Sequence, residues 1–240
     1  MKTINIAHLY YDLMNLYGEN GNMRILLKHL EDQKVEVKLS FLTIGDEIDF
    51  NTYDLVYMGT GSEINQKLVL QDLMKYKSEV KSAIDSNKFF LVTGNSIELF
   101  GNHIIDLKEN KIDCLACFDF YTKETEFRIV GEQVYESALI TQPIVGFQNR
   151  SGAMFDIENG PFKVKSGTGF KPKSEYEGII SNNFIATYLI GPILVRNPYF
   201  TEYLVKQLLD SNNIAYKKCL QGTEYKAYEA FLSNFNEMVK

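Results

Sequence analysis

The sequence has no tryptophan, only three cysteines among its 240 residues, and no apolar run near the roughly 20 residues that a membrane-spanning helix needs. An odd and sparse set of cysteines does not suit a disulfide framework, which favours a reducing compartment. The first residues contain no apolar stretch long enough for a signal peptide. We therefore expect a cytoplasmic protein without membrane insertion.

The charge balance narrows the possible partners. Lys and Arg number 25 and Asp and Glu number 31, which gives a formal net charge of −6. Nucleic acid and anionic lipid both bind through basic patches, so we expect neither as a partner. Apolar residues make up 45% of the chain, and 16 Phe and 15 Tyr supply large side chains for a core. This composition and length predict one globular domain over residues 1–240.

Short apolar runs alternate with amphipathic segments along the first hundred residues. The apolar runs predict strands at residues 4–9, 35–41, 53–58 and 89–93. Apolar residues at helical spacing predict helices at residues 23–30, at residues 65–86 as one long helix, and at residues 97–100. Strands that alternate with helices imply a mostly parallel sheet covered on both faces.

The second half of the chain has a different pattern. Strand-like segments occur at residues 127–135, 144–147, 178–180 and 184–190, and we expect them to add mixed or antiparallel strands to the same domain. Helices are expected at residues 197–209 and 224–239. The predicted fold class is a single-domain α/β protein of flavodoxin-like type, with a mostly parallel central sheet flanked by helices.

No complete cofactor or metal motif is present. Residues 59–62, Gly-Thr-Gly-Ser, lack the Lys-Ser/Thr of a phosphate-binding loop, so we expect no nucleotide. Cys114 and Cys117 form one CxxC pair without the second pair that a structural zinc needs, and Cys219 is isolated late in the chain. The histidines lie in no motif that pairs them with cysteine or serine and are expected to be structural or solvated: His8, His29 and His103.

Residues 90–101 are the most informative segment. They read Phe-Leu-Val-Thr-Gly-Asn-Ser-Ile-Glu-Leu-Phe-Gly, a buried strand, a sharp turn and the start of a helix. This is the frame of a nucleophile elbow, which presents one side chain at the end of a sheet. The N–H groups at the start of the helix could stabilise a thiolate and then an oxyanion.

This segment resembles class I glutamine amidotransferases of the cobyric-acid-synthase-like branch, in particular the glutaminase subunit of lipid II isoglutaminyl synthase, whose turn reads Cys-Gly-Gly-Tyr-Gln-x-x-Gly. Four further segments resemble family motifs in the same order. Residues 17–22 (Tyr-Gly-Glu-Asn-Gly-Asn) are similar to Tyr-Gly-Asp-x-Gly-Asn, and residues 59–62 to the oxyanion loop Gly-Gly-Gly-Ser. Residues 144–149 (Ile-Val-Gly-Phe-Gln-Asn) are similar to Ile-Val-Gly-Phe-Glu-Asn, and residues 187–194 (Thr-Tyr-Leu-Ile-Gly-Pro-Ile-Leu) to Thr-Tyr-Leu-His-Gly-Pro-Ile-Leu.

This sequence differs from the family pattern at the positions of the catalytic residues. The resemblance places Gly94 at the catalytic cysteine and Ile190 at the catalytic histidine, with Asn95 and Ser96 at the two glycines. Neither glycine nor isoleucine can form or process a glutamyl thioester. Our hypothesis is that Gly94 relieves the backbone strain of an elbow and that Ile190 fills the space of the imidazole.

Part of the binding site is retained. Arg128 matches an arginine that the resemblance places near the active site, and N–H groups around Gly59, Gly61 and Asn95 could form an anion-binding nest. A small carboxylate or amino acid is the ligand that these four residues would bind. Other positions differ from the family: Glu98 replaces Gln, Gln148 replaces Glu, Arg150 replaces His and Ala153 replaces Arg.

The resemblance also implies a partner. In active relatives, ammonia from glutamine passes to an ATP-using, Mur-ligase-like protein subunit that amidates the D-glutamate carboxyl of the peptidoglycan stem in lipid II. We expect this chain to form the same kind of hetero-oligomer, as a structural or regulatory subunit that does not carry out the glutaminase step. Two alternatives stay open: an enzyme with a relocated nucleophile at Ser96, Cys114 or Cys117, and a stand-alone small-molecule binding module that uses Arg128 and the Gly59–Gly61 loop.

Overall fold

The computed structural model describes residues 3–218 and 221–238 and contains a central six-stranded sheet. Five of its strands are parallel, in the order β12 (Phe184–Thr187), β4 (Phe89–Thr93), β3 (Leu55–Met58), β1 (Thr3–Leu9) and β2 (Glu36–Leu42). The short β11 (Ile179–Ser181) adds an antiparallel edge. Strands β3 and β4 are buried on both faces, as their unbroken apolar sequence requires.

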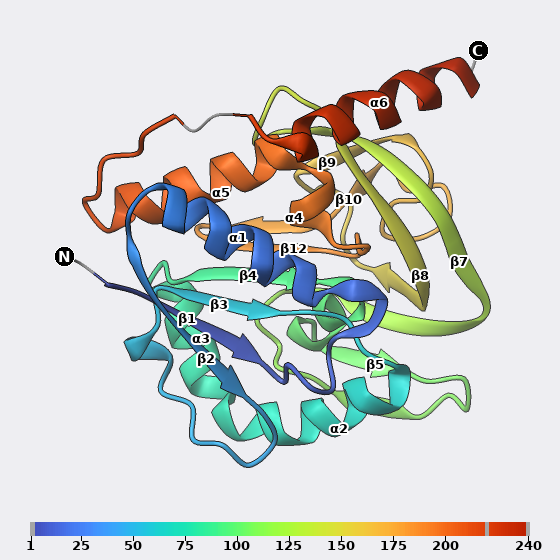
Figure 1. Cartoon of the computed structure of the whole chain (residues 1–240). Helices are drawn as coiled ribbons and strands as arrows, with labels where there is room; N and C mark the ends of the chain where they lie inside the picture. The colour runs from blue at the N-terminus through green and yellow to red at the C-terminus, as the bar shows by residue number, and fades with distance from the viewer. Residues whose placement is uncertain (1–2, 219–220, 239–240) are drawn as a thin grey trace.

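Helices cover both faces of this sheet (Figure 1). On one face lie α1 (Asn20–Asp32) and α5 (Pro198–Ser211), whose apolar residues share a core with β1 and β3. On the other lie α2 (Glu63–Leu73) and α3 (Lys77–Asp85). The remaining helices are α4 (Ile193–Arg196), α6 (Thr223–Met238) and the 3-10 turns η1 (Leu16–Gly18), η2 (Phe50–Thr52), η3 (Met74–Tyr76) and η4 (Gly94–Phe100).

The prediction of one long helix at residues 65–86 was wrong. The segment forms two helices, α2 and α3, separated by the 3-10 turn η3. Their buried apolar residues fall at one continuous helical spacing (Val69, Leu70, Leu73, Val80, Ala83 and Ile84). Periodicity alone therefore cannot distinguish one helix from two that cover the same face.

Residues 103–177 form a second, mostly antiparallel sheet beside the first, which the sequence analysis did not separate from it (Figure 1). Its strands are β5 (His103–Ile105), β6 (Lys111–Asp113), β7 (Tyr121–Ser137), β8 (Ile144–Phe155), β9 (Phe162–Ser166) and β10 (Tyr176–Glu177). The predicted strands at 127–135 and 144–147 are the parts of the long hairpin β7–β8 that lie nearest its turn. Strands that pair with each other can form a sheet of their own without joining the parallel one.

The predicted strand at residues 184–190 ends early. It leaves the central sheet after Thr187, and Ile190 then forms an antiparallel bridge with Phe147 of β8. This bridge joins the two sheets where the motif segments 144–149 and 187–194 meet.

The predicted α/β fold class, with a mostly parallel sheet flanked by helices, is confirmed. That residues 1–240 form one domain stays a prediction. Of the predicted helix at 224–239, Val239 lies outside the described residues. No helix in residues 3–218 and 221–238 is long and apolar enough to cross a membrane.

Candidate functional site

The candidate site lies at the carboxyl ends of β3 and β4, where parallel α/β sheets usually bind ligands. Residues 59–62 follow β3, and Gly94 follows β4 as the first residue of η4. Gly94 is buried and has φ +64°, a left-handed conformation that glycine adopts without steric cost. The strand, turn and helix predicted for residues 90–101 are therefore present.

The space beside Gly94 is filled by two neighbouring side chains. A Cβ atom built on Gly94 would overlap the side chain of Thr60 and lie 2.9 Å from Cγ2 of Ile190. Ile190 itself is buried at 2% exposure. The structure thus brings Gly94 and Ile190 together, as the motifs predicted, and adds Thr60, which the sequence analysis treated only as part of a loop.

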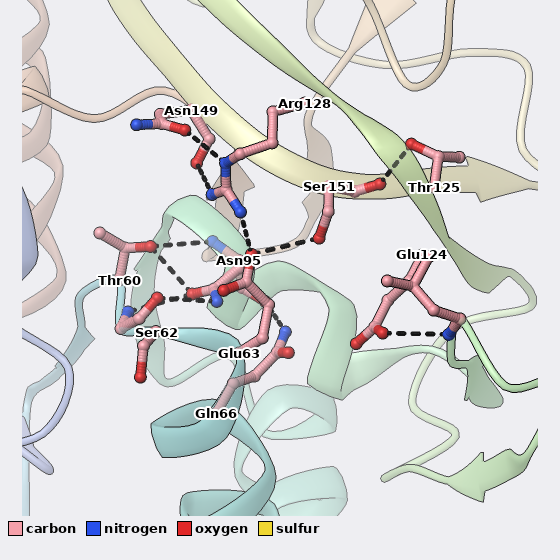
Figure 2. A network of polar contacts seen from close by, with 12 residues as sticks. Thr60, Ser62, Glu63, Gln66, Asn95, Glu124, Thr125, Arg128, Asn149 and Ser151 are labelled. Carbon is pink, nitrogen blue, oxygen red and sulfur yellow. Dashed lines mark hydrogen bonds and ion pairs between the residues drawn. The ribbon is translucent and has the colours of Figure 1, made fainter.

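Two backbone N–H groups of the predicted anion-binding nest are already occupied within the protein (Figure 2). The Gly61 N–H donates to Asn95 Oδ1 at 3.1 Å, and the Asn95 N–H donates to Thr60 Oγ1 at 3.2 Å. Thr60 Oγ1 also donates to Asn95 Oδ1 at 2.8 Å, and Asn95 Nδ2 donates to the Gly61 carbonyl at 2.9 Å. Asn95 therefore ties the two loops together, and an anion would have to displace its side chain from the Gly61 N–H and the Thr60 hydroxyl from the Asn95 N–H.

Gly59 is held in the same loop by other contacts. Its carbonyl accepts a hydrogen bond from Ser96 Oγ. A Cβ atom on Gly59 would overlap the Met14 carbonyl and lie 3.2 Å from Cβ of Glu19. Only glycine fits this close approach between the loop after β3 and residues 14–19.

Arg128 reaches from β7 toward the N-terminus of α2, above this network (Figure 2). Its Nη1 lies 2.5 Å from Oε1 of Glu63, and its Nε and Nη2 donate to Oδ1 and the carbonyl of Asn149 at 2.8 and 3.1 Å. Ser151 Oγ donates to the same Glu63 oxygen at 3.2 Å. Partial burial raises the pKa of Glu63, but the hydrogen bond and charge of Arg128, together with hydrogen bonds from the backbone and Ser151, outweigh it and lower the pKa overall.

The carboxylate of Glu63, from the same chain, is thus bound to Arg128, the arginine that the resemblance assigns to substrate binding. Sequence reasoning missed it because 65 residues separate it from Arg128. The only local signal was that Ser62 and Glu63 are typical of a helix start, and Ser62 Oγ does accept from the Asn65 N–H.

A buried carboxyl group, Glu19, connects the motif at residues 17–22 with the elbow. Its Oε2 accepts hydrogen bonds from Thr93 Oγ1 and, at 3.0 Å, from the hydroxyl of Tyr57. Asn22 bonds both to Tyr57 and, through Oδ1, to the N–H of Leu194. Burial raises the pKa of Glu19 to about 7, against the opposing effect of these hydrogen bonds. Three motif segments therefore share one polar network.

A second buried network surrounds Glu98. Gln66 Nε2 donates to Glu98 Oε2 at 2.8 Å and to the Asn95 carbonyl at 2.6 Å, and the Tyr188 hydroxyl donates to Glu98 Oε1 at 3.1 Å. The guanidinium of Arg150 lies 3.7 Å from the centre of the Tyr188 ring. Burial raises the pKa of Glu98 to about 7, and the hydrogen bond from Gln66 and the charge of Arg150 oppose this shift.

Arg150 is itself buried and fully engaged. Its Nε donates to Gln148 Oε1 at 3.1 Å, and its Nη1 and Nη2 donate to the carbonyls of Gly152 and Gly169. Gln148 in turn donates to the hydroxyl of Tyr135 at 2.9 Å. Arg150 and Gln148, where the resemblance expects His and Glu, therefore serve the packing between β8 and its neighbours. Ala153 is also buried there.

The alternative nucleophiles are poorly placed for chemistry. Ser96 is fully buried and its hydroxyl is bound to the Gly59 carbonyl. Burial raises the pKa of Cys114 to about 12 and that of Cys117 to about 11, so both are thiols at neutral pH. Among the side chains that the structure describes, in residues 3–218 and 221–235, no three of His, Cys, Asp or Glu are grouped to hold a metal ion. Cys219 lies outside the described residues.

Known proteins support the resemblance at the level of family. Residues 5–198 match the model of the CobB/CobQ-like glutamine amidotransferase domain. The chain is 30% identical over 233 residues to subunit GatD of the glutamine-hydrolysing lipid II isoglutaminyl synthase of Streptococcus pneumoniae, covering 96% of this chain and 87% of the relative. It is 28% identical to the subunit of that name from Staphylococcus aureus, covering 100% and 99%.

Solved structures agree on the fold. A glutamine amidotransferase from Thermotoga maritima superposes with a TM-score of 0.52 at 10% identity, covering 96% of this chain and 90% of its own. Another glutamine amidotransferase gives a TM-score of 0.56 at 12% identity, covering 85% and 98%. At such identities the likeness concerns the fold alone.

Proposed function

Because the chain belongs to the CobB/CobQ-like glutamine amidotransferase family, we propose that it is a subunit of a lipid II isoglutaminyl synthase-type complex that has lost the glutaminase step. It works in the cytoplasm with a Mur-ligase-like, ATP-using partner that amidates the D-glutamate carboxyl of the peptidoglycan stem. The chain contributes structure or regulation to this hetero-oligomer, and the partner draws on free ammonia.

One observation carries the proposal. The place of a nucleophilic side chain at residue 94 is taken by Thr60 and Ile190, and Gly94 has no side chain to present. A glutaminase of this class needs a thiolate that attacks the carboxamide and an imidazole that moves the proton. Occupied N–H groups at Gly61 and Asn95 point the same way, because an oxyanion hole needs free donors.

The test is covalent trapping. The purified chain, alone and with its partner, is incubated with a diazo-ketone analogue of glutamine and its intact mass is measured, with the Streptococcus pneumoniae relative as positive control. We expect no adduct and no release of ammonia from glutamine. An adduct on this chain would overturn the proposal, and loss of turnover in Ser96→Ala, Cys114→Ala or Cys117→Ala would establish the relocated nucleophile instead.

The partner is tested separately. The Mur-ligase-like protein from the same organism is co-purified with this chain, and amidation of lipid II is measured with ammonium chloride or with glutamine as nitrogen source. We expect a stable complex that amidates lipid II with ammonium and not with glutamine. Failure to co-purify would favour the stand-alone binding module.

A further inference from the structure

A small cavity lies between α1 and the β1–β2 edge of the central sheet, apart from the residues around Gly94. Its volume is about 160 Å³. Its apolar walls come from Met23 and Leu27 of α1 and from Leu39 and Phe41 of β2. A cavity of this size accommodates a ligand of about six to eight non-hydrogen atoms.

Two polar side chains at this cavity lack hydrogen-bond partners. His8 of β1 is completely buried, and neither Nδ1 nor Nε2 bonds to any described residue. The same is true of Oδ1 of Asn20, the first residue of α1, although its backbone N–H is bonded. Nearly all buried polar atoms in proteins have a partner, and an unpaired one costs about 1–3 kcal/mol. Three such atoms, on two side chains at one cavity, indicate a ligand that supplies missing bonds.

The surroundings of His8 define the chemistry of that ligand. Its ring packs against three aromatic rings, with centroid distances of 4.9 Å to Tyr57, 5.9 Å to Phe41 and 6.3 Å to Tyr11. Burial lowers the pKa of His8 to about 4, so at neutral pH the imidazole offers one N–H donor and one acceptor nitrogen. The walls carry no charge, and Arg24 at the mouth is exposed to solvent, so an ionised ligand inside the cavity would pay a desolvation cost without a buried counter-charge.

We propose that this cavity binds a small neutral molecule with an aromatic or aliphatic body and one hydroxyl group, of the size of a phenol. A hydroxyl both donates and accepts, so it can satisfy a nitrogen of His8 and Oδ1 of Asn20 together. The apolar body of the ligand lies between Met23 and Leu27 of α1 and Phe41 of β2. Entry is past Phe41 and Arg24, whose exposed side chains stand at the mouth.

Binding of phenol and of toluene to the whole chain tests the proposal. The two probes have the same size and shape, and toluene replaces the hydroxyl by a methyl group. Isothermal calorimetry and thermal unfolding give the affinities, while ¹⁵N-histidine NMR shows whether the His8 imidazole responds. We expect saturable phenol binding that shifts the His8 nitrogens, with toluene about tenfold weaker because it cannot form the hydrogen bonds.

Two variants locate the site. His8→Phe keeps an aromatic ring and should remove the preference for phenol over toluene, whereas the control His103→Phe, on β5, should leave it unchanged. Leu27→Trp should fill the cavity and abolish binding of both probes. The proposal is overturned if the wild-type chain does not bind phenol, if Leu27→Trp still binds it, or if a crystal soaked in phenol holds only a water between His8 and Asn20.

Discussion

Cγ2 of Ile190 lies 2.9 Å from the point that a Cβ atom on Gly94 would occupy, and the Thr60 side chain overlaps that point. The family pattern that this chain resembles has glycine where Thr60 stands. The proposed loss of a cysteine side chain at residue 94 would thus be matched by added side-chain volume at residue 60. These three positions are physically linked, since the side chains of Thr60 and Ile190 fit in this arrangement only while residue 94 is glycine.

Gly94→Cys is expected to destabilise the protein by about 2–5 kcal/mol without creating a glutaminase. The cysteine would adopt a left-handed backbone conformation and would collide with Thr60 and Ile190. Urea unfolding measures the change, with an unaltered m-value as the sign that only stability has changed.

Gly45→Cys is the matched control for that experiment. Gly45 also has positive φ, +89°, but a Cβ atom there meets nothing within 4 Å. It should therefore show only the backbone cost, about 1–2 kcal/mol. Equal losses at both positions, or a more stable Gly94→Cys protein, would show that the space beside Gly94 is not tightly filled.

Thr60→Gly should partly rescue Gly94→Cys. Alone, Thr60→Gly loses both hydrogen bonds to Asn95 and leaves a void, which should cost about 1–3 kcal/mol. In the Gly94→Cys background the same change removes a collision. A double-mutant cycle should therefore give a favourable interaction of about 1–3 kcal/mol, and strictly additive losses would contradict the proposed exchange of volume.

Much of this arrangement could be predicted from sequence, because local patterns encode it. The strand at 89–93, the turn at Gly94 and the helix after it follow from an apolar run and a turn sequence. The motifs also placed Ile190 opposite Gly94. What they could not give was the crowding by Thr60, since this depends on the distance between two loops that are far apart in the sequence.

Pairings that depend on tertiary structure were missed for a related reason. The ion pair between Arg128 and Glu63 joins β7 of the second sheet to α2, and no spacing rule relates its partners. The second sheet was not separated from the first because the pattern of a strand does not name the strand that it pairs with. Similarly, the expectation that His8 is structural or solvated did not specify that it is buried with neither ring nitrogen bonded to a described residue.

Glu63→Gln should allow Arg128 to bind a small carboxylate ligand. In the wild-type chain the guanidinium is occupied by Glu63 and Asn149, so small carboxylates should not raise the melting temperature. Removing the internal carboxylate frees the arginine, and L-glutamate or acetate should then stabilise the variant in a saturable manner. Thermal unfolding over a ligand series measures this.

Glu126→Gln is the control, because Glu126 is an exposed acid two residues from Arg128 on the same strand. It removes one negative charge near the site but leaves the ion pair intact, and it should behave as wild type. Equal stabilisation of the wild-type chain and of Glu63→Gln by carboxylates would show that Glu63 does not block Arg128.

Glu98→Gln should change how stability depends on pH. Burial raises the pKa of Glu98 to about 7, above its ordinary value of 4.5. Between those values the folded chain holds a proton that the unfolded chain has lost, so the free energy of unfolding falls as pH rises. The loss begins near pH 4.5 and is complete above pH 7. Glutamine keeps the shape of the neutral acid, so the variant should be more stable than wild type at pH 8 by about 1–3 kcal/mol.

Urea unfolding between pH 5 and pH 8 tests that expectation, with Glu175→Gln as control because Glu175 is exposed on the surface. The advantage of Glu98→Gln should shrink toward pH 5, where the wild-type carboxyl is already protonated in the folded state. The control should show no such trend. An advantage of Glu98→Gln that did not change with pH would show that the stability difference comes from packing and not from ionisation. An advantage that grew toward pH 5 would show that Glu98 is ionised in the folded chain and stabilised by Arg150.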